Sequence, residues 1–132
     1  MSGRRHVLYV DGNGDGTPPA YLEEADFEVH TTARIADALD RLATESVDCV
    51  VTEYDLEDGS GLEIVEALRE EQPQTPVVLF TETRPGEIDT ASFEEMIVEY
   101  LNRDLPDAAD RLGFVVDDVI THSAQVGFLT PD

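Results

Sequence analysis

Polar and charged residues stand at the ends of four short apolar runs of the sequence, and these positions are the candidates for chemistry. The positions are Asp11, Gly12, Glu53, Asp55, Thr81, Asn102 and Arg103. Carboxylates from two of the run ends are the hard oxygen ligands that Mg²⁺ binds in proteins. A hydroxyl and a guanidinium from the other two are groups that hydrogen bond to phosphoryl oxygens. The pattern therefore predicts a metal or phosphate site, provided that the fold brings the run ends together.

The apolar runs predict buried β-strands. They are rich in β-branched and aromatic types and cover residues 6–10, 48–52, 76–80 and 96–101. Nearly continuous apolarity is typical of a strand that is covered on both faces of a parallel sheet. A fifth run, residues 27–31, alternates between apolar and polar types, which favours an edge strand.

Amphipathic segments between the runs predict helices. Three of them have apolar residues at helical spacing and cover residues 35–42, 62–68 and 108–123. Thr32 and Ser60 are the expected N-caps of the first two, and Pro106 stands where the third would begin. Residues 18–25 and 85–95 predict two further helices with weaker patterns.

Strands that alternate with helices along the whole chain predict one α/β domain with a parallel sheet covered on both faces. The leading topology is the flavodoxin-like (βα)5 three-layer sandwich with strand order 2-1-3-4-5. We expect this domain to span residues 1–126, followed by a flexible tail at residues 127–132. Ligands of such a sheet bind beyond the carboxyl ends of the strands, near the switch point between strands 1 and 3. The candidate residues stand at those ends.

The charge balance limits the partners of the chain. Its 132 residues include 30 Asp and Glu but only 8 Lys and Arg, all of them arginine, for a formal net charge of −22. A surface this acidic repels nucleic-acid backbones and anionic membranes, so we expect neither as a partner. Self-repulsion of this kind destabilises a compact fold in dilute salt and is screened in molar salt. The composition therefore favours a cytoplasmic protein of a halophilic archaeon.

Secretion, disulfides and zinc are not expected. Residues 1–5 lack the apolar segment of a signal peptide, and no apolar stretch approaches the roughly 20 residues of a membrane span. Cys49 is the only cysteine, which excludes an internal disulfide and favours a small buried apolar residue. His6, His30 and His122 are not grouped in the sequence, so we expect neither a zinc site nor a histidine phosphotransfer site.

Four motifs, in this order and at this spacing, resemble those of response regulator receiver domains, the kind found in chemotaxis regulators. They are residues 7–11, residues 50–56 with 59–63, residues 79–81 and residues 99–103. The resemblance covers nearly the whole chain. It implies a signal-transduction domain of a two-component phosphorelay, which is not itself an enzyme. It also implies a protein partner, namely a histidine kinase or a downstream signalling protein.

The resemblance implies roles for the acidic strand-end residues. Asp11 matches the first of two adjacent acids that hold Mg²⁺, and Gly12 stands where the second would be. Glu53 matches the aspartate that accepts the phosphoryl group. Asp55 matches the residue whose backbone carbonyl reaches the metal, which makes Asp11 and Asp55 the implied metal-site residues. Asp55 is also an alternative phosphoacceptor.

The resemblance further implies a conformational switch. Thr81 matches the hydroxyl residue that moves toward the phosphoryl group, and Tyr100 matches the aromatic residue whose rotamer follows it. Arg103 falls where receivers keep a lysine that pairs with the acyl phosphate. The alternatives are that Thr81 is an ordinary hydroxyl at a strand end and that Tyr100 only fills the core.

Three positions depart from the family pattern. Glu53 is longer than aspartate by one methylene, which moves its carboxylate by about 1.5 Å, and such a misplacement can cost about a hundredfold in a chemical step. Gly12 lacks a carboxylate, which weakens Mg²⁺ binding. Arg103 keeps the charge, and its planar fork suits an ion pair with Glu53. Such a pair either imitates the phosphorylated state or is an ordinary salt bridge in a decayed site.

These departures favour a stand-alone pseudo-receiver with a degenerate phosphorylation site and no resident cofactor, its Mg²⁺ binding being weakened. It would act through protein–protein association, with a homodimer through the face of helix 4, strand 5 and helix 5, within residues 93–120, as one form. The alternative is an active response regulator that is phosphorylated on an acidic residue with Mg²⁺. A small enzyme on the same scaffold is a third hypothesis, although no nucleophile–base pair is visible in the sequence.

Overall fold

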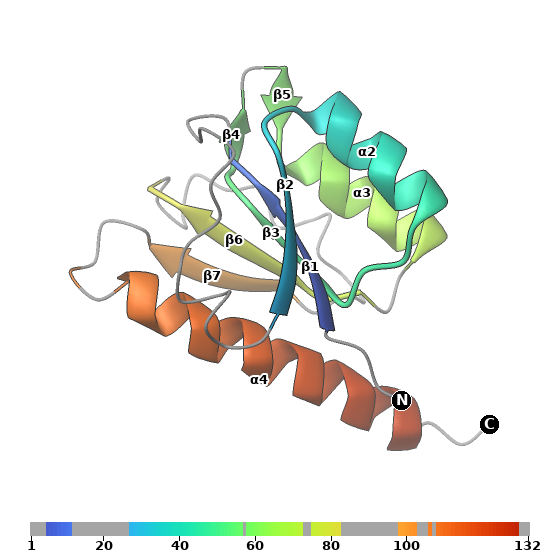
Figure 1. The fold of residues 1–132 in the computed structure, drawn as a ribbon, viewed down its shortest axis with the longest axis vertical. Coiled ribbons are helices and arrows are strands. Elements are labelled where there is room, and N and C mark those ends of the chain that lie inside the picture. The colour runs from blue at the N-terminus through green and yellow to red at the C-terminus, as the bar shows by residue number, and fades with distance from the viewer. Residues whose placement is uncertain are drawn as a thin grey trace.

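Five parallel strands form the central sheet, in the spatial order β2-β1-β3-β6-β7 (Figure 1). The computed structural model describes residues 5–11, 27–56, 58–72, 75–82, 98–102, 106 and 108–129. The strands are β1 (Arg5–Val10), β2 (Phe27–Thr32), β3 (Cys49–Thr52), β6 (Val77–Thr81) and β7 (Val98–Asn102). Numbered along the chain, these five strands follow the order 2-1-3-4-5. The flavodoxin-like topology predicted from the sequence is therefore confirmed.

Helices cover both faces of the sheet and complete a three-layer sandwich. Helices α2 (Ile35–Thr44) and α3 (Leu62–Glu71) lie side by side on one face, and α4 (Ala108–Leu129) crosses the other face (Figure 1). Helix α4 includes residues 127–129, which the sequence assigned to a tail. The helices predicted over residues 18–25 and 85–95 lie outside the described residues. No helix in the described part of the chain is long and apolar enough to span a bilayer.

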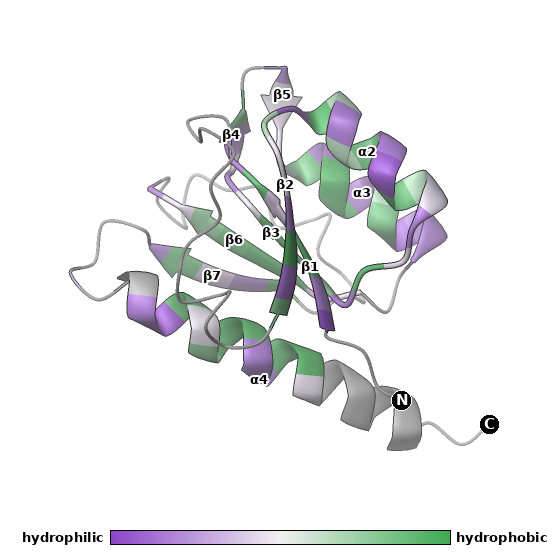
Figure 2. Ribbon diagram, viewed as in Figure 1, coloured by the Kyte–Doolittle hydropathy of each residue, from purple (hydrophilic) through white to green (hydrophobic). Residues whose placement is uncertain are grey.

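The near-continuous apolar runs fill two separate cores, one on each face of the sheet. Successive side chains of a strand point to opposite faces. Thus Val7 and Tyr9 of β1 pack with α4, whereas Leu8 and Val10 pack with α2 and α3. Figure 2 shows the middle strands β3 and β6 as mostly hydrophobic, whereas both kinds of residue alternate along the helices. Each fully buried aliphatic side chain stabilises the fold by about 1.5–3 kcal/mol.

Cys49 belongs to the core on the α4 face. It is fully buried, and burial raises the pKa of its thiol, with the nearby Asp48 carboxylate acting in the same direction. A buried thiol with a raised pKa is a poor nucleophile. The expectation that Cys49 is a small buried apolar residue is confirmed.

Helix α2 is capped from a distant part of the chain. Its N-cap position is Arg34, which makes no side-chain cap. Asp58 instead accepts hydrogen bonds from the N–H groups of Ile35 (3.0 Å) and Ala36 (3.2 Å). A carboxylate here satisfies N–H groups that lack helical partners and faces the positive end of the helix dipole. The N-cap role predicted for Thr32 is wrong, because Thr32 ends β2 and its buried Oγ1 has no hydrogen-bond partner among the described residues.

Helix α3 begins with a reciprocal pair of hydrogen bonds. The Ser60 Oγ accepts from the Leu62 N–H at 3.1 Å, and the Glu63 carboxylate accepts from the Ser60 N–H at 3.3 Å. The arrangement is close to a capping box. In that motif the serine side chain accepts from a backbone N–H of the first helical turn, and the side chain of a glutamate three residues later accepts from the serine N–H. The N-cap predicted at Ser60 is wrong by one residue, because Gly61 occupies the N-cap position, although the Ser60 hydroxyl still accepts from the first N–H of the helix.

Replacing Asp58 by alanine should lower the midpoint of thermal unfolding at neutral pH by about a few degrees, because two helix N–H groups lose their acceptor. The Ile35 N–H, opposed by desolvation and aided by the Ala36 N–H, holds the pKa of Asp58 below its ordinary value of 3.8. The ionised carboxylate therefore stabilises the fold fully at pH values above the ordinary pKa, and this contribution is lost as the pH falls through the lowered pKa of the folded state. Thermal unfolding followed by circular dichroism from neutral to strongly acidic pH checks this dependence.

Asp118→Ala is the matched control, because Asp118 is exposed on α4 and its loss removes the same charge. The Asp58 variant should unfold at a lower temperature than the Asp118 variant at neutral pH, and this difference should disappear in acid. If the two variants unfold together at every pH, Asp58 does not cap α2.

Candidate functional site

The carboxyl ends of β1 and β3 meet at the switch point of the sheet. The hydrogen-bond ladder extends one residue past these strands, since the Asp11 N–H donates to the Thr32 carbonyl and the Glu53 N–H donates to the Val10 carbonyl, each at 3.0 Å. The backbones of Asp11 and Glu53 are thus held by the sheet rather than by a loose loop. This placement agrees with the position that the sequence predicted for both residues.

The Glu53 carboxylate lies between two donors. The Thr81 hydroxyl donates a hydrogen bond to Glu53 Oε2, and the Tyr54 N–H donates to the same oxygen at 3.2 Å. Thr81 is fully buried at the end of β6, whereas Glu53 is half-buried. Hydrogen bonds to an ionised acceptor are about twice as strong as neutral ones. The sequence therefore correctly anticipated that the ends of β3 and β6 bring Glu53 and Thr81 together.

The turn after Glu53 is tight and needs glycine at two positions. Strands β4 (Asp55–Leu56) and β5 (Gly59–Ser60) form a small antiparallel hairpin beside the site. Gly59 has a φ of 148°, a backbone conformation that favours glycine. At Gly61, whose N–H donates to the Tyr54 carbonyl at 2.7 Å, a Cβ would collide with the carbonyl oxygen of Glu53. The chain therefore turns back against Glu53 and fixes its backbone from both sides.

Asp11 is a buried carboxylate with a tyrosine partner. It is 8% exposed, and the Tyr9 hydroxyl donates to its Oδ2 at 3.2 Å. Tyr9 was expected only as part of a buried strand, so this contact was not predicted from the sequence. Two features of the sequence indicate the Tyr9–Asp11 contact. The residues are two apart on one strand, so their side chains share a face, and a buried tyrosine hydroxyl usually has a hydrogen-bond partner.

The other predicted site residues occupy the rim or lie outside the described residues. Asp55 is exposed at the start of β4, opposite Ser60. Tyr100 is half-buried on β7 and stands opposite Leu79. Asn102, the last residue of β7, stands opposite Thr81, which places β7 beside the Glu53–Thr81 contact. Gly12, Arg103 and hence the predicted Glu53–Arg103 ion pair lie outside the described residues.

The described donor set fits Mg²⁺ poorly. Mg²⁺ requires near-octahedral coordination by oxygen atoms, usually with one or two carboxylates. Asp11 supplies one carboxylate, of which Oδ2 already accepts from the Tyr9 hydroxyl. The Glu53 Oε2 likewise accepts from the Thr81 hydroxyl and the Tyr54 N–H. The site therefore suits a hydrogen-bonded carboxylate better than a metal ligand.

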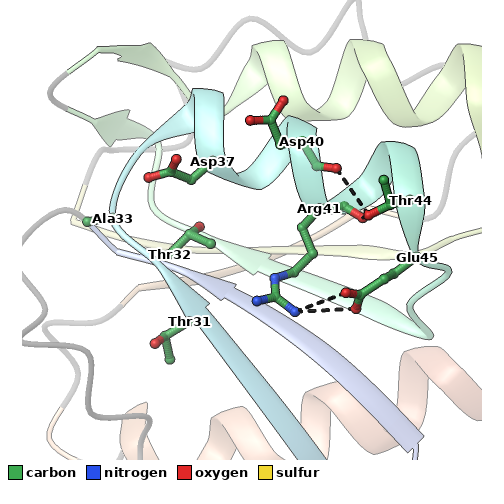
Figure 3. Close-up of a pocket in the computed structure, with 8 residues that line it drawn as sticks. All are labelled: Thr31, Thr32, Ala33, Asp37, Asp40, Arg41, Thr44 and Glu45. Atoms are coloured by element: carbon green, nitrogen blue, oxygen red, sulfur yellow. Dashed lines mark hydrogen bonds and ion pairs between the residues drawn. The ribbon is translucent and has the colours of Figure 1, made fainter.

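A polar groove of about 680 Å³ runs along α2 from the end of β2 (Figure 3). Its lining includes the acidic side chains Asp37, Asp40 and Glu45. The Arg41 guanidinium also lines it and pairs with Glu45 at 3.3 Å, as shown in Figure 3. Such a lining repels anionic ligands, so the groove does not suit a phosphorylated molecule.

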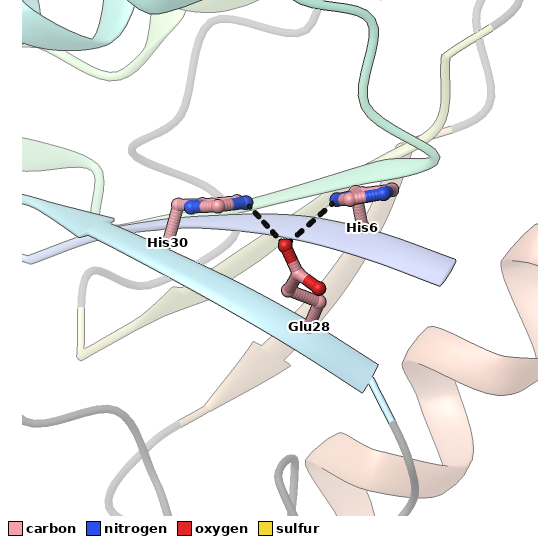
Figure 4. Close-up of side chains that lie close together, drawn as sticks. All are labelled: His6, Glu28 and His30. Carbon is pink, nitrogen blue, oxygen red and sulfur yellow. Dashed lines mark ion pairs between the residues drawn. The ribbon is translucent and has the colours of Figure 1, made fainter. Parts of the chain in front are cut away.

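A second cluster lies on β1 and β2, between the amino end of β1 and the middle of β2. His6 of β1 and His30 of β2 converge on Glu28, so the expectation that the histidines are not grouped is wrong for these two (Figure 4). The two histidines are 24 residues apart in the sequence, and only the pairing of β1 with β2 brings them together.

Comparisons with known proteins agree with the fold. Residues 19–110 match the family described as the response regulator receiver domain. The response regulator protein PilR of Pseudomonas aeruginosa is 36% identical over 90 residues, which cover 67% of this chain and 20% of PilR. The regulatory protein LuxO of Vibrio cholerae is 26% identical over 109 residues, which cover 81% of this chain and 23% of LuxO. The chain thus spans about a fifth of the length of these curated relatives.

Solved structures share the fold at low sequence identity. A CheY-like response regulator receiver domain protein from Methanospirillum hungatei has a TM-score of 0.78 at 16% identity, covering 93% of this chain and 98% of that chain. That likeness concerns the fold, and the family match extends over more than half of the sequence. The chain therefore belongs to the response regulator receiver domain family of two-component signalling.

Proposed function

We propose that this receiver domain has a degenerate phosphorylation site and transmits its signal through protein–protein association. The observation that carries the proposal is the hydrogen bond from the Thr81 hydroxyl to the Glu53 carboxylate. In the receiver family, the hydroxyl at this position moves toward a phosphoryl group on an aspartate. In this chain the hydroxyl has a carboxylate acceptor without any phosphoryl transfer.

The extra methylene of glutamate accounts for the contact. It extends the side chain beyond the position that an aspartate carboxylate would take, so that Oε2 reaches Thr81 and also the Tyr54 N–H. The same displacement opposes in-line attack on a phosphodonor, since reactivity depends on placement within about 1 Å. The poor fit of the described donor set to Mg²⁺ also opposes phosphoryl transfer to Glu53. Glu53 therefore takes over the hydrogen-bonding role of the phosphoryl group, although with less negative charge.

The contact can influence a partner-binding surface through β7. Residues 79–81 of β6 pair in register with residues 100–102 of β7, and α4 packs beside both strands. Phe114 of α4 is 78% exposed and lies within residues 93–120, the segment expected to form the association surface. A large exposed aromatic side chain is typical of an interface. The partner would be a histidine kinase, a downstream signalling protein or a second copy of the chain.

The chain should gain no stable phosphoryl group when it is incubated with a small-molecule phosphodonor and Mg²⁺ in molar KCl. Intact-protein mass spectrometry measures the outcome, and a receiver with aspartate at the acceptor position serves as the positive control in the same buffer. A stable gain of one phosphoryl group would support the alternative, an active response regulator phosphorylated on an acidic residue. Peptide mapping would then distinguish Glu53 from Asp55.

The hydrogen bond between Thr81 and Glu53 should appear as a coupling energy in a double-mutant cycle. Thr81→Val and Glu53→Gln should each lower the free energy of unfolding by about 1–2 kcal/mol, since each weakens a charge-assisted bond. The double variant should be destabilised by about 1 kcal/mol less than the sum of the two single effects, because both substitutions weaken the same interaction. Urea unfolding of the four proteins in molar KCl measures the cycle.

Thr52→Val is the matched control for this cycle. Thr52 is also fully buried at a strand end, but its hydroxyl donates to the backbone carbonyl of Glu53, at 2.9 Å, rather than to the carboxylate. Its coupling with Glu53→Gln should therefore be weaker than that of Thr81→Val, because the Thr52 hydroxyl contacts the Glu53 backbone and not its carboxylate. Equal coupling for Thr52 and Thr81 would remove the support for a specific Thr81–Glu53 interaction.

We further propose that the chain works in the cytoplasm of a halophilic archaeon. The formal net charge of −22 is the supporting observation. Raising KCl from about 0.1 M to about 1 M shortens the Debye length from about 10 Å to about 3 Å. The midpoint of thermal unfolding should therefore rise over this range of KCl, as measured by circular dichroism. A midpoint that does not change, or that falls, would count against adaptation to molar salt.

A further inference from the structure

Two histidines and a glutamate form a cluster on β1 and β2. His6 stands directly opposite Glu28 in the parallel pairing, and His30 is two residues beyond Glu28 on the same strand. Residues two apart on a strand point to the same face, so all three side chains share one face of the sheet. Figure 4 shows a nitrogen of each imidazole turned toward the same oxygen of Glu28.

The spacing of the three side chains matches that of metal ligands. Glu28 Oε2 lies 3.6 Å from His6 Nδ1 and 3.5 Å from His30 Nε2, and all the ligand atoms lie within 4.8 Å of one another. Tetrahedral zinc, with bonds of about 2.0–2.1 Å, separates its ligand atoms by about 3.3–3.4 Å. Small side-chain rotations would therefore bring all three atoms to bonding distance of one ion.

The two rings already have related orientations. Their planes are parallel within 5°, with centroids 5.7 Å apart. The backbone N–H of His6 also donates to Asp48 Oδ2 at 2.8 Å, which holds the first strand residues near a further carboxylate. We propose that His6, Glu28 and His30 bind one divalent transition-metal ion of the zinc class, with water completing the coordination.

The chemistry of the cluster favours a transition metal over Mg²⁺ or Ca²⁺. Imidazole nitrogens suit Zn²⁺ and its neighbours, whereas Mg²⁺ and Ca²⁺ prefer oxygen ligands alone. The side chains of His6, Glu28 and His30 are 43%, 48% and 25% exposed, so an ion can reach them from solvent. The net negative charge of the chain raises the local concentration of cations.

The cluster is separate from the receiver site. His6 precedes Asp11 by five residues of extended strand, or about 16 Å, and His30 stands opposite Leu8, three residues or about 10 Å before Asp11. A metal ion here would join the edge strand β2 to β1 and stabilise the folded state, because it binds an arrangement that the unfolded chain lacks. This inference does not rest on the state of Glu53, so either proposal can fail without the other.

The test measures Zn²⁺ binding to the full 132-residue chain, free of a histidine tag and stripped with a chelator. Titration calorimetry in molar KCl with excess Mg²⁺ should give one Zn²⁺ per chain, because Mg²⁺ occupies scattered carboxylates but not imidazoles. Glu28→Gln and His30→Gln should each weaken binding at least about tenfold, since even outer-shell partners of a metal are worth about 10–100-fold. Zn²⁺ should also raise the midpoint of thermal unfolding of the parent and not of these variants.

His122→Gln is the matched control, because it removes a histidine from α4 and leaves the cluster intact. This variant should bind Zn²⁺ with the affinity of the parent. Circular dichroism shows that each variant is folded, and His6→Gln provides an independent variant if His30→Gln is not. Affinity that is unchanged in the Glu28, His6 and His30 variants, or Zn²⁺ binding that excess Mg²⁺ abolishes, would overturn the proposal.

Discussion

The burial of β3 on both faces of the sheet is the constraint on which the rest of the structure depends. All four of its residues are inaccessible to solvent, with Val50 in one core and Cys49 and Val51 in the other. Strands β1 and β6 pair with β3 on either side. Because apolar side chains fix the position of β3, the residue that follows it must emerge at the carboxyl edge of the sheet. That residue is Glu53, which explains why the strand-end chemistry gathers there.

The segment after β3 connects the site with the helices on one face. Glu53 meets Thr81, Gly61 packs against the Glu53 backbone, and Asp58 caps α2. The Ser60–Glu63 pair then begins α3. One short stretch of chain thus holds the half-buried Glu53 carboxylate, a tight turn, the cap of α2 and the start of α3. The chain that follows Glu53 therefore joins the strand-end site to the starts of α2 and α3.

The two ends of the sheet carry different chemistry. The carboxyl edge has carboxylates in contact with hydroxyls, namely Glu53 with Thr81 and Asp11 with Tyr9. Near the amino edge, His6 and His30 share Glu28. Hydroxyl groups hold a carboxylate by hydrogen bonds, whereas imidazole nitrogens can bind a transition-metal ion of the zinc class. The carboxyl edge and the histidine cluster therefore present different ligand groups on one sheet.

The sequence by itself determined the strands, the order of the sheet and the positions at which polar groups would gather. These features follow from local patterns, because continuous apolar runs must be buried on both faces and parallel strands share a carboxyl edge. The cap of α2 and the histidine cluster were decided only by the tertiary structure. Asp58 is 23 residues from Ile35, and His30 approaches His6 only through the register of β2 against β1. A local pattern carries no information about such contacts, because their geometry is fixed by the packing of elements far apart in the chain.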